Sequence, residues 1–273
     1  MKARLFNVLL SVLLFANFSP VKLFSADKMQ KTFSGTSGGR LEVTVEGGAI
    51  EVTGGTLDQT TVVLECSKDI EEHYNVTIEK QGNSVVVSAK RKGEGSFGFL
   101  NFLSGRWPSL KVSAQVPRQN DVNLNTSGGH LEITGLEGSV DAKTSGGGIA
   151  CNDIRGNVTV YTSGGSVSCE QITGSLEART SGGGIHLASI TGPFNAKTSG
   201  GRIEAEALTG DGSLATSGGG IEVNACNGRL DAATSGGSIE VSGHEGAVMT
   251  STGGGNISVT FNTPPAGDCE LKT

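Results

Sequence analysis

The side chains that could do acid–base, nucleophilic or metal chemistry are scattered along this chain. Its four histidines lie far apart, and no Ser/His/Asp order, phosphate-binding loop or metal-ligand spacing is present. Asp141, Asp153 and Asp211 are candidate acids for polysaccharide cleavage, but only Asp231 shares the spacing of one of them, Asp141. The sequence therefore predicts no catalytic residues, no metal site and no cofactor.

Cysteine is the remaining reactive side chain, and its number is odd. The five residues are Cys66, Cys151, Cys169, Cys226 and Cys269, without a CxxC pair. Cys151 and Cys169 lie 18 residues apart, which in stacked strands means a separation of about 4.8 Å. That distance permits a disulfide, but parallel side chains in register reach the required dihedral poorly. We expect two small buried thiols, with a disulfide as the alternative.

A Gly-rich segment, 93–108, carries most of the remaining binding potential. Its aromatic residues are Phe97, Phe99, Phe102 and Trp107, the last being the only Trp in the chain. Exposed aromatics anchor partner proteins, sugar rings or membrane interfaces. The alternative is that this loop folds back and closes one end of the fold.

The element that must position all these groups is an 18-residue repeat. Thr-Ser-Gly-Gly recurs without interruption, and a variant without Ser follows. The repeats begin at Thr126, Thr144, Thr162, Thr180, Thr198, Thr216 and Thr234, and the variant begins at Thr252. A fixed period of this size is typical of a solenoid, in which each turn stacks only on its neighbours.

The apolar residues within each repeat define two short strands. Counting each Thr as position zero, positions five and seven are mostly apolar and form one inward face. Positions fourteen and sixteen, together with the next Thr, form the second inward face. The sequence thus predicts an all-β, right-handed parallel β-solenoid with two strands and two bends per turn, its hand following the crossover rule.

The bends are predicted at Ser-Gly-Gly and around a Gly at position twelve. We expect Gly there because it adopts positive φ without steric cost. Thr then points inward, where its hydroxyl needs a partner from neighbouring Thr residues or bend amides. An inward Thr argues against an ice- or crystal-binding ladder, and leaves Ser at position one as the outward residue.

Most of the outward positions are typical of a solvated surface. Position four, after the bend glycines, is never acidic, which argues against a calcium-binding β-roll. Position six stacks Glu204, Glu222 and Glu240 into a like-charge row that resists edge association. Asp141 and Lys143 form an expected surface pair, as do Glu177 and Arg179.

The two ends of the chain differ from the array. Lys2, Arg4 and the apolar run 5–18 predict a signal peptide over 1–26, cleaved after Ser25 or Ala26, with an uncleaved anchor as the alternative. After it, 27–117 predicts an entry rung and a small antiparallel cap, including a hairpin turned at Gly82. The solenoid covers 118–262.

The last segment, 263–273, begins a further turn. Pro264, Pro265 and Ala266 interrupt the period, and removing them would place Thr273 at the start of another motif. We expect a fragment or a truncated reading frame here.

The chain resembles the bacterial putative adhesin family, whose domains are of unknown function and carry β-strand repeats. The resemblance rests on Gly38–Val43, the Gly82–Asn83 turn, the aromatic loop, the strand ending at Pro117 and the Thr-Ser-Gly-Gly array. It implies an exported β-solenoid and an adhesive role, and no catalytic residues. Members commonly carry Asp after Ser-Gly-Gly, and this chain does not.

Charge and composition limit the partners. Removal of 1–26 leaves 18 Lys and Arg against 27 Asp and Glu, a net charge of −9 that argues against nucleic acid. No segment after the signal is long and apolar enough to span a membrane. The leading hypothesis is an exported, non-catalytic scaffold binding protein or glycan at the envelope, in the periplasm, on the surface or outside. An envelope-stress or structural accessory protein is the alternative, and a polysaccharide-active enzyme comes third.

Overall fold

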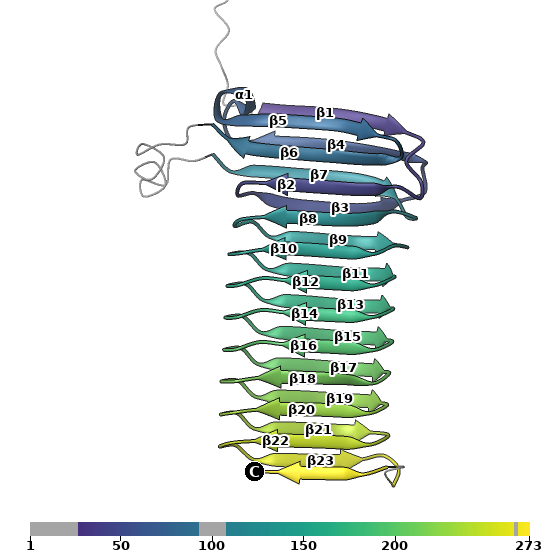
Figure 1. Cartoon of the computed structure of the whole chain (residues 1–273), viewed down its shortest axis with the longest axis vertical. Helices are drawn as coiled ribbons and strands as arrows, with labels where there is room; N and C mark the ends of the chain where they lie inside the picture. Colours follow the sequence, from purple (N-terminus) through teal and green to yellow (C-terminus); the bar gives the residue numbers. More distant parts are fainter. Residues whose placement is uncertain (1–26, 93–107, 265–266) are drawn as a thin grey trace, which may run out of the picture.

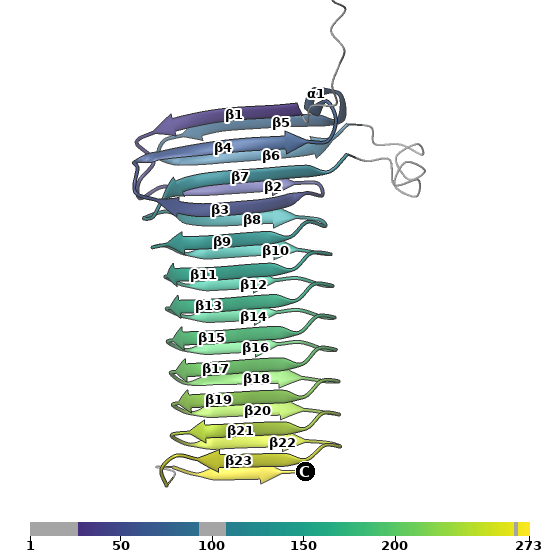
Figure 2. The same ribbon diagram turned by 180° about the vertical axis from the view of Figure 1, so that it is seen from behind.

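Two twelve-stranded β-sheets lie face to face and form one long stack (Figure 1; Figure 2). The computed structural model describes residues 27–92, 108–264 and 267–273. Sheet A has the strand order β1-β4-β7-β3-β9-β11-β13-β15-β17-β19-β21-β23, and sheet B has the order β24-β22-β20-β18-β16-β14-β12-β10-β8-β2-β6-β5. The alternation of odd and even strands along the array shows that each turn gives one strand to each sheet.

The array strands pair in parallel, with an offset of 18 residues from β8 and β9 as far as β22 and the start of β23. In sheet A they are β9 (Leu131–Leu136), β11 (Ile149–Arg155), β13 (Val167–Thr173), β15 (Ile185–Thr191), β17 (Ile203–Thr209), β19 (Ile221–Asn227), β21 (Ile239–His244) and β23 (Ile257–Phe261). In sheet B they are β8 (Asp121–Thr126), β10 (Val140–Thr144), β12 (Val158–Tyr161), β14 (Leu176–Arg179), β16 (Phe194–Lys197), β18 (Gly212–Thr216), β20 (Leu230–Thr234), β22 (Val248–Thr252) and β24 (Cys269–Lys272). The predicted parallel β-solenoid with two short strands per turn is confirmed.

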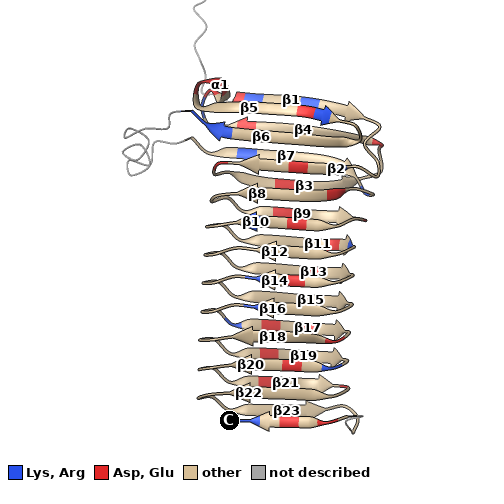
Figure 3. Ribbon diagram, in the orientation of Figure 1, with Lys and Arg blue, Asp and Glu red and all other residues tan. Residues whose placement is uncertain are grey.

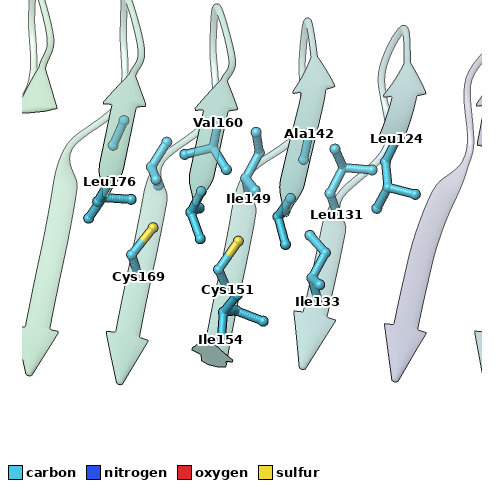
Figure 4. Close-up of a cluster of buried hydrophobic side chains, with 14 of the residues drawn as sticks. Leu124, Leu131, Ile133, Ala142, Ile149, Cys151, Ile154, Val160, Cys169 and Leu176 are labelled. Atoms are coloured by element: carbon cyan, nitrogen blue, oxygen red, sulfur yellow. The ribbon is translucent and has the colours of Figure 1, made fainter. Parts of the chain in front are cut away.

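The core is a thin apolar layer between the two sheets. Ile149 and Cys151 of sheet A, and Ala142 and Val160 of sheet B, are buried, and Figure 4 shows how such side chains line up from turn to turn. Because successive strand residues point to opposite faces, the inward positions repeat while the outward ones are free to vary. Small residues at position sixteen keep the layer narrow.

Position nine contains a backbone feature that the repeat pattern did not predict. Asp153, Gln171, Ser189, Ala207 and Ala225 all have φ between 51° and 57°. This left-handed residue is skipped in the strand register, so that Asn152 pairs with Glu170 and Ile154 with Ile172. The extra residue explains why the inward positions run five, seven and ten, a step that strict alternation cannot produce.

The glycines of Ser-Gly-Gly serve a different purpose from the one we predicted. Among the described residues, positive φ is found at the position-twelve glycines from Gly156 to Gly246, but at none of the bend glycines after Thr126. A Cβ on Gly165, at position three, would lie 2.0 Å from the carbonyl oxygen of Gly147 one turn back. The positive-φ explanation is therefore wrong at this bend, where Gly is required because stacked backbones approach each other closely.

The N-terminal cap extends both sheets. It comprises β1 (Asp27–Ser34), β2 (Arg40–Val45), β3 (Ala49–Gly55), β4 (Gln59–Cys66), α1 (Ile70–His73), β5 (Tyr74–Gln81), β6 (Ser84–Arg91) and β7 (Leu110–Pro117). β2 and β3 form the entry rung beside β8 and β9, and β6 and β7 add a second parallel rung. β1, β4 and β5 then close the stack with antiparallel pairing. The predicted β5–β6 hairpin is confirmed, with Gly82 at φ 62° in its turn.

The far end of the array contains the three-residue interruption. β24 pairs with β22 so that Val248 lies beside Cys269 and Ser251 beside Lys272. This offset is three residues longer than the repeat, as expected if 264–266 are an insertion.

Candidate functional site

The inward Thr ladder has an acceptor that the sequence analysis did not identify. The Thr144 hydroxyl donates to the carbonyl of Gly129, at position three of the preceding turn, over 2.9 Å. The same bond recurs from Thr162, Thr180, Thr198, Thr216, Thr234 and Thr252 to Gly147, Gly165, Gly183, Gly201, Gly219 and Gly237. All these Thr residues are buried, which confirms their inward orientation, and the exposed Ser at position one is confirmed as outward.

Each Thr hydroxyl bonds to a backbone carbonyl that would accept a backbone N–H in a regular parallel sheet. In parallel pairing, the N–H at position four would bond to the position-three carbonyl one turn back. Within the part of the chain that the structure describes, the N–H groups of Gly148, Ser166 and Gly184 donate to no protein acceptor. The Thr ladder thus leaves a row of backbone donors at position four, on the edge of sheet A.

A hollow of about 410 Å³ lies over these donors. Its lining residues are His130, Gly148, Ile149, Ala150, Ser166, Val167, Ser168, Gly184, Ile185, His186, Arg202 and Glu204. The hollow exists because position four is Gly or Ser in three consecutive turns, between the larger His130 and Arg202. We call this surface the position-four trough; it runs across the strands, along the axis of the stack.

The electrostatics of the trough come from its two ends. Arg202 contacts Glu204 at 3.4 Å and also pairs with Glu222, and His186 Nδ1 lies 3.9 Å from Glu204. Glu204 is the only carboxylate in the lining, and it pairs with Arg202. The position-four carbonyls accept from strand N–H groups, as Ser166 does from Ile149 over 2.9 Å. The unused polar groups of the trough are therefore predominantly donors.

The comparisons with known proteins place this architecture in a family. Residues 39–245 match the Toastrack DUF4097 family. The chain belongs to this family. The match confirms the resemblance seen in the sequence, although the family is itself one of unknown function.

Solved structures of similar architecture are known. A putative adhesin from Bacteroides fragilis is 15% identical, with a TM-score of 0.47, and the alignment covers 92% of this chain and 99% of that one. A putative adhesin from Parabacteroides merdae is 11% identical, with a TM-score of 0.45 and coverage of 89% and 95%. A putative lipid binding protein from Parabacteroides distasonis is 13% identical, with a TM-score of 0.41 and coverage of 90% and 97%. No curated protein matches the chain.

The acidic row of this Toastrack solenoid lies beside the trough on sheet A. Glu204, Glu222 and Glu240 are direct neighbours in the strand register of β17, β19 and β21, as predicted. Figure 3 shows acidic positions in red on these strands. Arg202 bridges the first two. Position six is Ala150 and Ser168 in the trough itself, so the carboxylate row begins where the trough ends.

The outer face of sheet B offers a different chemistry. Lys143 and Asp141 pair at 3.0 Å, and Arg179 and Glu177 pair at 2.5 Å, which confirms both predicted surface pairs. Tyr161 stands between these pairs with 43% of its surface exposed. In each of these two pairs the cation and the carboxylate lie on the same strand, so their charges compensate each other locally.

Two smaller hollows lie elsewhere on the Toastrack chain. One, of about 280 Å³, lies on sheet B near the last strand and is lined in part by Asp231, Met249 and Lys272. The other, of about 300 Å³, lies where the cap meets the array, beside Leu57 and Arg118. There Arg118 pairs with Asp153 at 3.0 Å and with Glu137 at 3.6 Å, so its charge is compensated.

The other sequence-based candidates are not gathered by the fold. Phe97, Phe99, Phe102 and Trp107 lie outside the described residues, as do the predicted signal peptide and its cleavage sites. Asp141 points outward from sheet B, whereas Asp153 lies within β11 of sheet A and pairs with Arg118. Across 27–92, 108–264 and 267–273, no group of three or more His, Cys, Asp or Glu side chains could hold a metal ion. The same residues include no helix long and apolar enough to span a membrane.

The thiols follow the expectation for buried cysteine. Cys151 and Cys169 are free, buried and adjacent in the register, and Figure 4 shows their sulfur atoms on neighbouring strands. A hydrogen bond with Cys151, together with burial, raises the pKa of Cys169 well above its usual value. Burial raises the pKa of Cys226 to about 11. Cys269 is the exposed thiol.

Proposed function

We propose that this Toastrack chain is an exported, non-catalytic scaffold that binds a partner at the cell envelope through the outer face of its solenoid. The observation that carries the proposal is the contrast between inward and outward positions. Inward residues repeat from turn to turn, whereas position four changes from His130 through Gly and Ser to Arg202 and so forms a trough on a rigid support. Surface variation on a rigid scaffold is how repeat proteins build binding faces.

The chemistry of the trough supports binding rather than catalysis. Its one carboxylate, Glu204, is paired with Arg202 and has no second carboxylate within the lining to act as its acid–base partner. The predicted signal peptide and the similarity of the fold to proteins called adhesins support export. An adhesive role and an accessory role inside the envelope both follow from this proposal.

Protease treatment of intact cells that produce the full chain tests the location and separates the two roles. If the chain is an adhesin, the protease should digest its solenoid while a periplasmic marker protein stays intact. Protection of the chain until the outer membrane is opened favours the accessory role. Recovery of the chain in the cytoplasm with residues 1–26 still attached would contradict export altogether.

A binding screen tests the scaffold role. The mature chain and a variant without residues 93–108 are compared on arrays of glycans and matrix proteins. Retained binding by the variant assigns recognition to the solenoid face, and lost binding assigns it to the aromatic loop. Release of new reducing ends from any bound glycan would contradict the non-catalytic proposal.

A further inference from the structure

We propose that the position-four trough binds a linear polysaccharide bearing carboxylate groups, with the glycan lying along the solenoid axis. This inference rests on the proposed scaffold function and adds the ligand class. It follows from three properties of the trough: the polarity of its free groups, its repeat distance and the charges that bound it.

The polarity of the free groups selects an acceptor-rich ligand. The backbone N–H groups of Gly148, Ser166 and Gly184 have no protein acceptor in the described structure, because the Thr ladder uses the matching carbonyls. His130 adds a further nitrogen-bearing side chain at one end, whereas the Arg202 guanidinium at the other end already pairs with Glu204 and Glu222. Carboxylate and hydroxyl oxygens are the complement to such a set of backbone donors.

The repeat distance selects a sugar polymer over a peptide. Donors recur once per turn, at the strand spacing of about 4.8 Å. This spacing is comparable with the length of one pyranose unit in an extended chain. An extended peptide advances only about 3.3 Å per residue, so its groups would fall out of step with the turns. Position four carries no side chain at Gly148 and Gly184 and only a small one at Ser166, which leaves room for the sugar rings.

The surrounding charges fix where the anionic ligand can lie. Position six is uncharged at Ala150 and Ser168, but it is Glu132 before them and Glu204, Glu222 and Glu240 after His186. Glu170, on the next outward column, accepts a hydrogen bond from the Ser168 hydroxyl over 3.3 Å. A polyanion is therefore repelled along sheet A on both sides of the trough, whereas within the trough the free donors lie beside the uncharged Ala150 and Ser168.

A pair of matched substitutions tests the site. Ser166→Glu places a carboxylate in the centre of the trough, whereas Ser238→Glu makes the same change at position four outside it. Both residues are exposed, and position four accepts large side chains at His130 and Arg202, so both variants should fold. The probe is a penta-galacturonate titrated into the full mature chain by calorimetry, with its fully methyl-esterified form as the uncharged counterpart.

We expect the unmodified chain to bind penta-galacturonate and not to bind its methyl ester. Ser166→Glu should weaken this binding by about tenfold or more, since like charges meet, and Ser238→Glu should leave it within about twofold. Equal losses in the two variants, equal binding of the ester, or no binding of the acid would each overturn the inference. The proposed scaffold function is tested separately, by protease treatment of cells and by the binding screen. If the protease removes the chain from cells and the chain binds another partner, the scaffold function stands even where one of these results overturns the inference.

Discussion

The hydroxyl of Thr162 donates a 2.7 Å hydrogen bond to the carbonyl of Gly147, one turn earlier in the stack. The N–H of Gly165 approaches the same hydroxyl at 3.3 Å, so the Thr joins two successive bends. This relay, repeated along the array, links architecture to surface chemistry. It holds the turns together from inside, and it leaves the N–H groups of position four without their usual acceptors.

Removing the relay should destabilise the array. Thr162→Val keeps the shape of the side chain but loses both bonds, and we expect a loss of about 1–2 kcal/mol because the carbonyl of Gly147 loses the Thr162 hydroxyl as its donor. The midpoint of guanidinium unfolding measures the change. Thr173→Val, on an exposed position of β13, is the control and should stay within about 0.5 kcal/mol. Equal midpoints for the two variants would show that the relay adds no stability.

Adjacent bend glycines should respond very differently to alanine. A Cβ on Gly165 would lie 2.0 Å from a carbonyl oxygen, whereas the nearest atom to a Cβ on Gly164 is 3.6 Å away. We expect Gly165→Ala to cost about 3 kcal/mol, at the upper end of overpacking, and Gly164→Ala to cost under about 1 kcal/mol. Thermal unfolding of both variants checks this. Tolerance of alanine at Gly165 would contradict the close stacking of the bends.

The left-handed residue at position nine offers a route to higher stability. Ala207 has φ 52°, a conformation that costs an L-residue about 1 kcal/mol and costs glycine almost nothing. Ala207→Gly should therefore raise the free energy of unfolding by about 0.5–1 kcal/mol. Ala188→Gly, in the regular part of β15, should lower it by a similar amount. A loss of stability in both variants would contradict the left-handed conformation of Ala207.

Thiol reactivity should follow burial. In the native chain one of the five cysteines, Cys269, is exposed and should react with a thiol reagent at pH 8, and all five should react after unfolding. The pKa of Cys226 is raised from 9.0 to about 11, so its contribution to stability is fully present below pH 9 and is lost as the pH rises through 11. Mass spectrometry after labelling identifies the sites. Native labelling of Cys151 or Cys169 would contradict the packed core.

Much of the fold was predictable because strand alternation has a strict consequence. Once Ile149 and Cys151 were placed inside, the period fixed the inward positions of every other turn, and the inward Thr followed from the second strand. The reason for the bend glycines was not predictable, because steric approach between turns depends on the stacking distance rather than on local φ. The left-handed residue at position nine left a trace in the odd step between Cys151 and Ile154, which only a skipped residue explains.

The candidate site was less predictable than the fold. The position-four residues were visible in the sequence, but their value as a trough depends on which backbone N–H groups lack acceptors. That property emerges only when the Thr162 hydroxyl is seen to bond to Gly147 rather than to another Thr. The aromatic loop drew attention because aromatic side chains are conspicuous in a sequence, whereas free backbone donors leave no mark on residue type.

Amide hydrogen exchange tests the link between the Thr relay and the trough most directly. In an isotopically labelled sample followed by NMR, the N–H groups of Gly148, Ser166 and Gly184 should exchange rapidly. Their neighbours Ile149, Val167 and Ile185, which donate to the next turn over 2.9–3.0 Å, should be strongly protected. Rapid exchange at position four beside slow exchange at position five is the predicted result. Equal protection at both positions would contradict the account, because the trough would then have no free backbone donors.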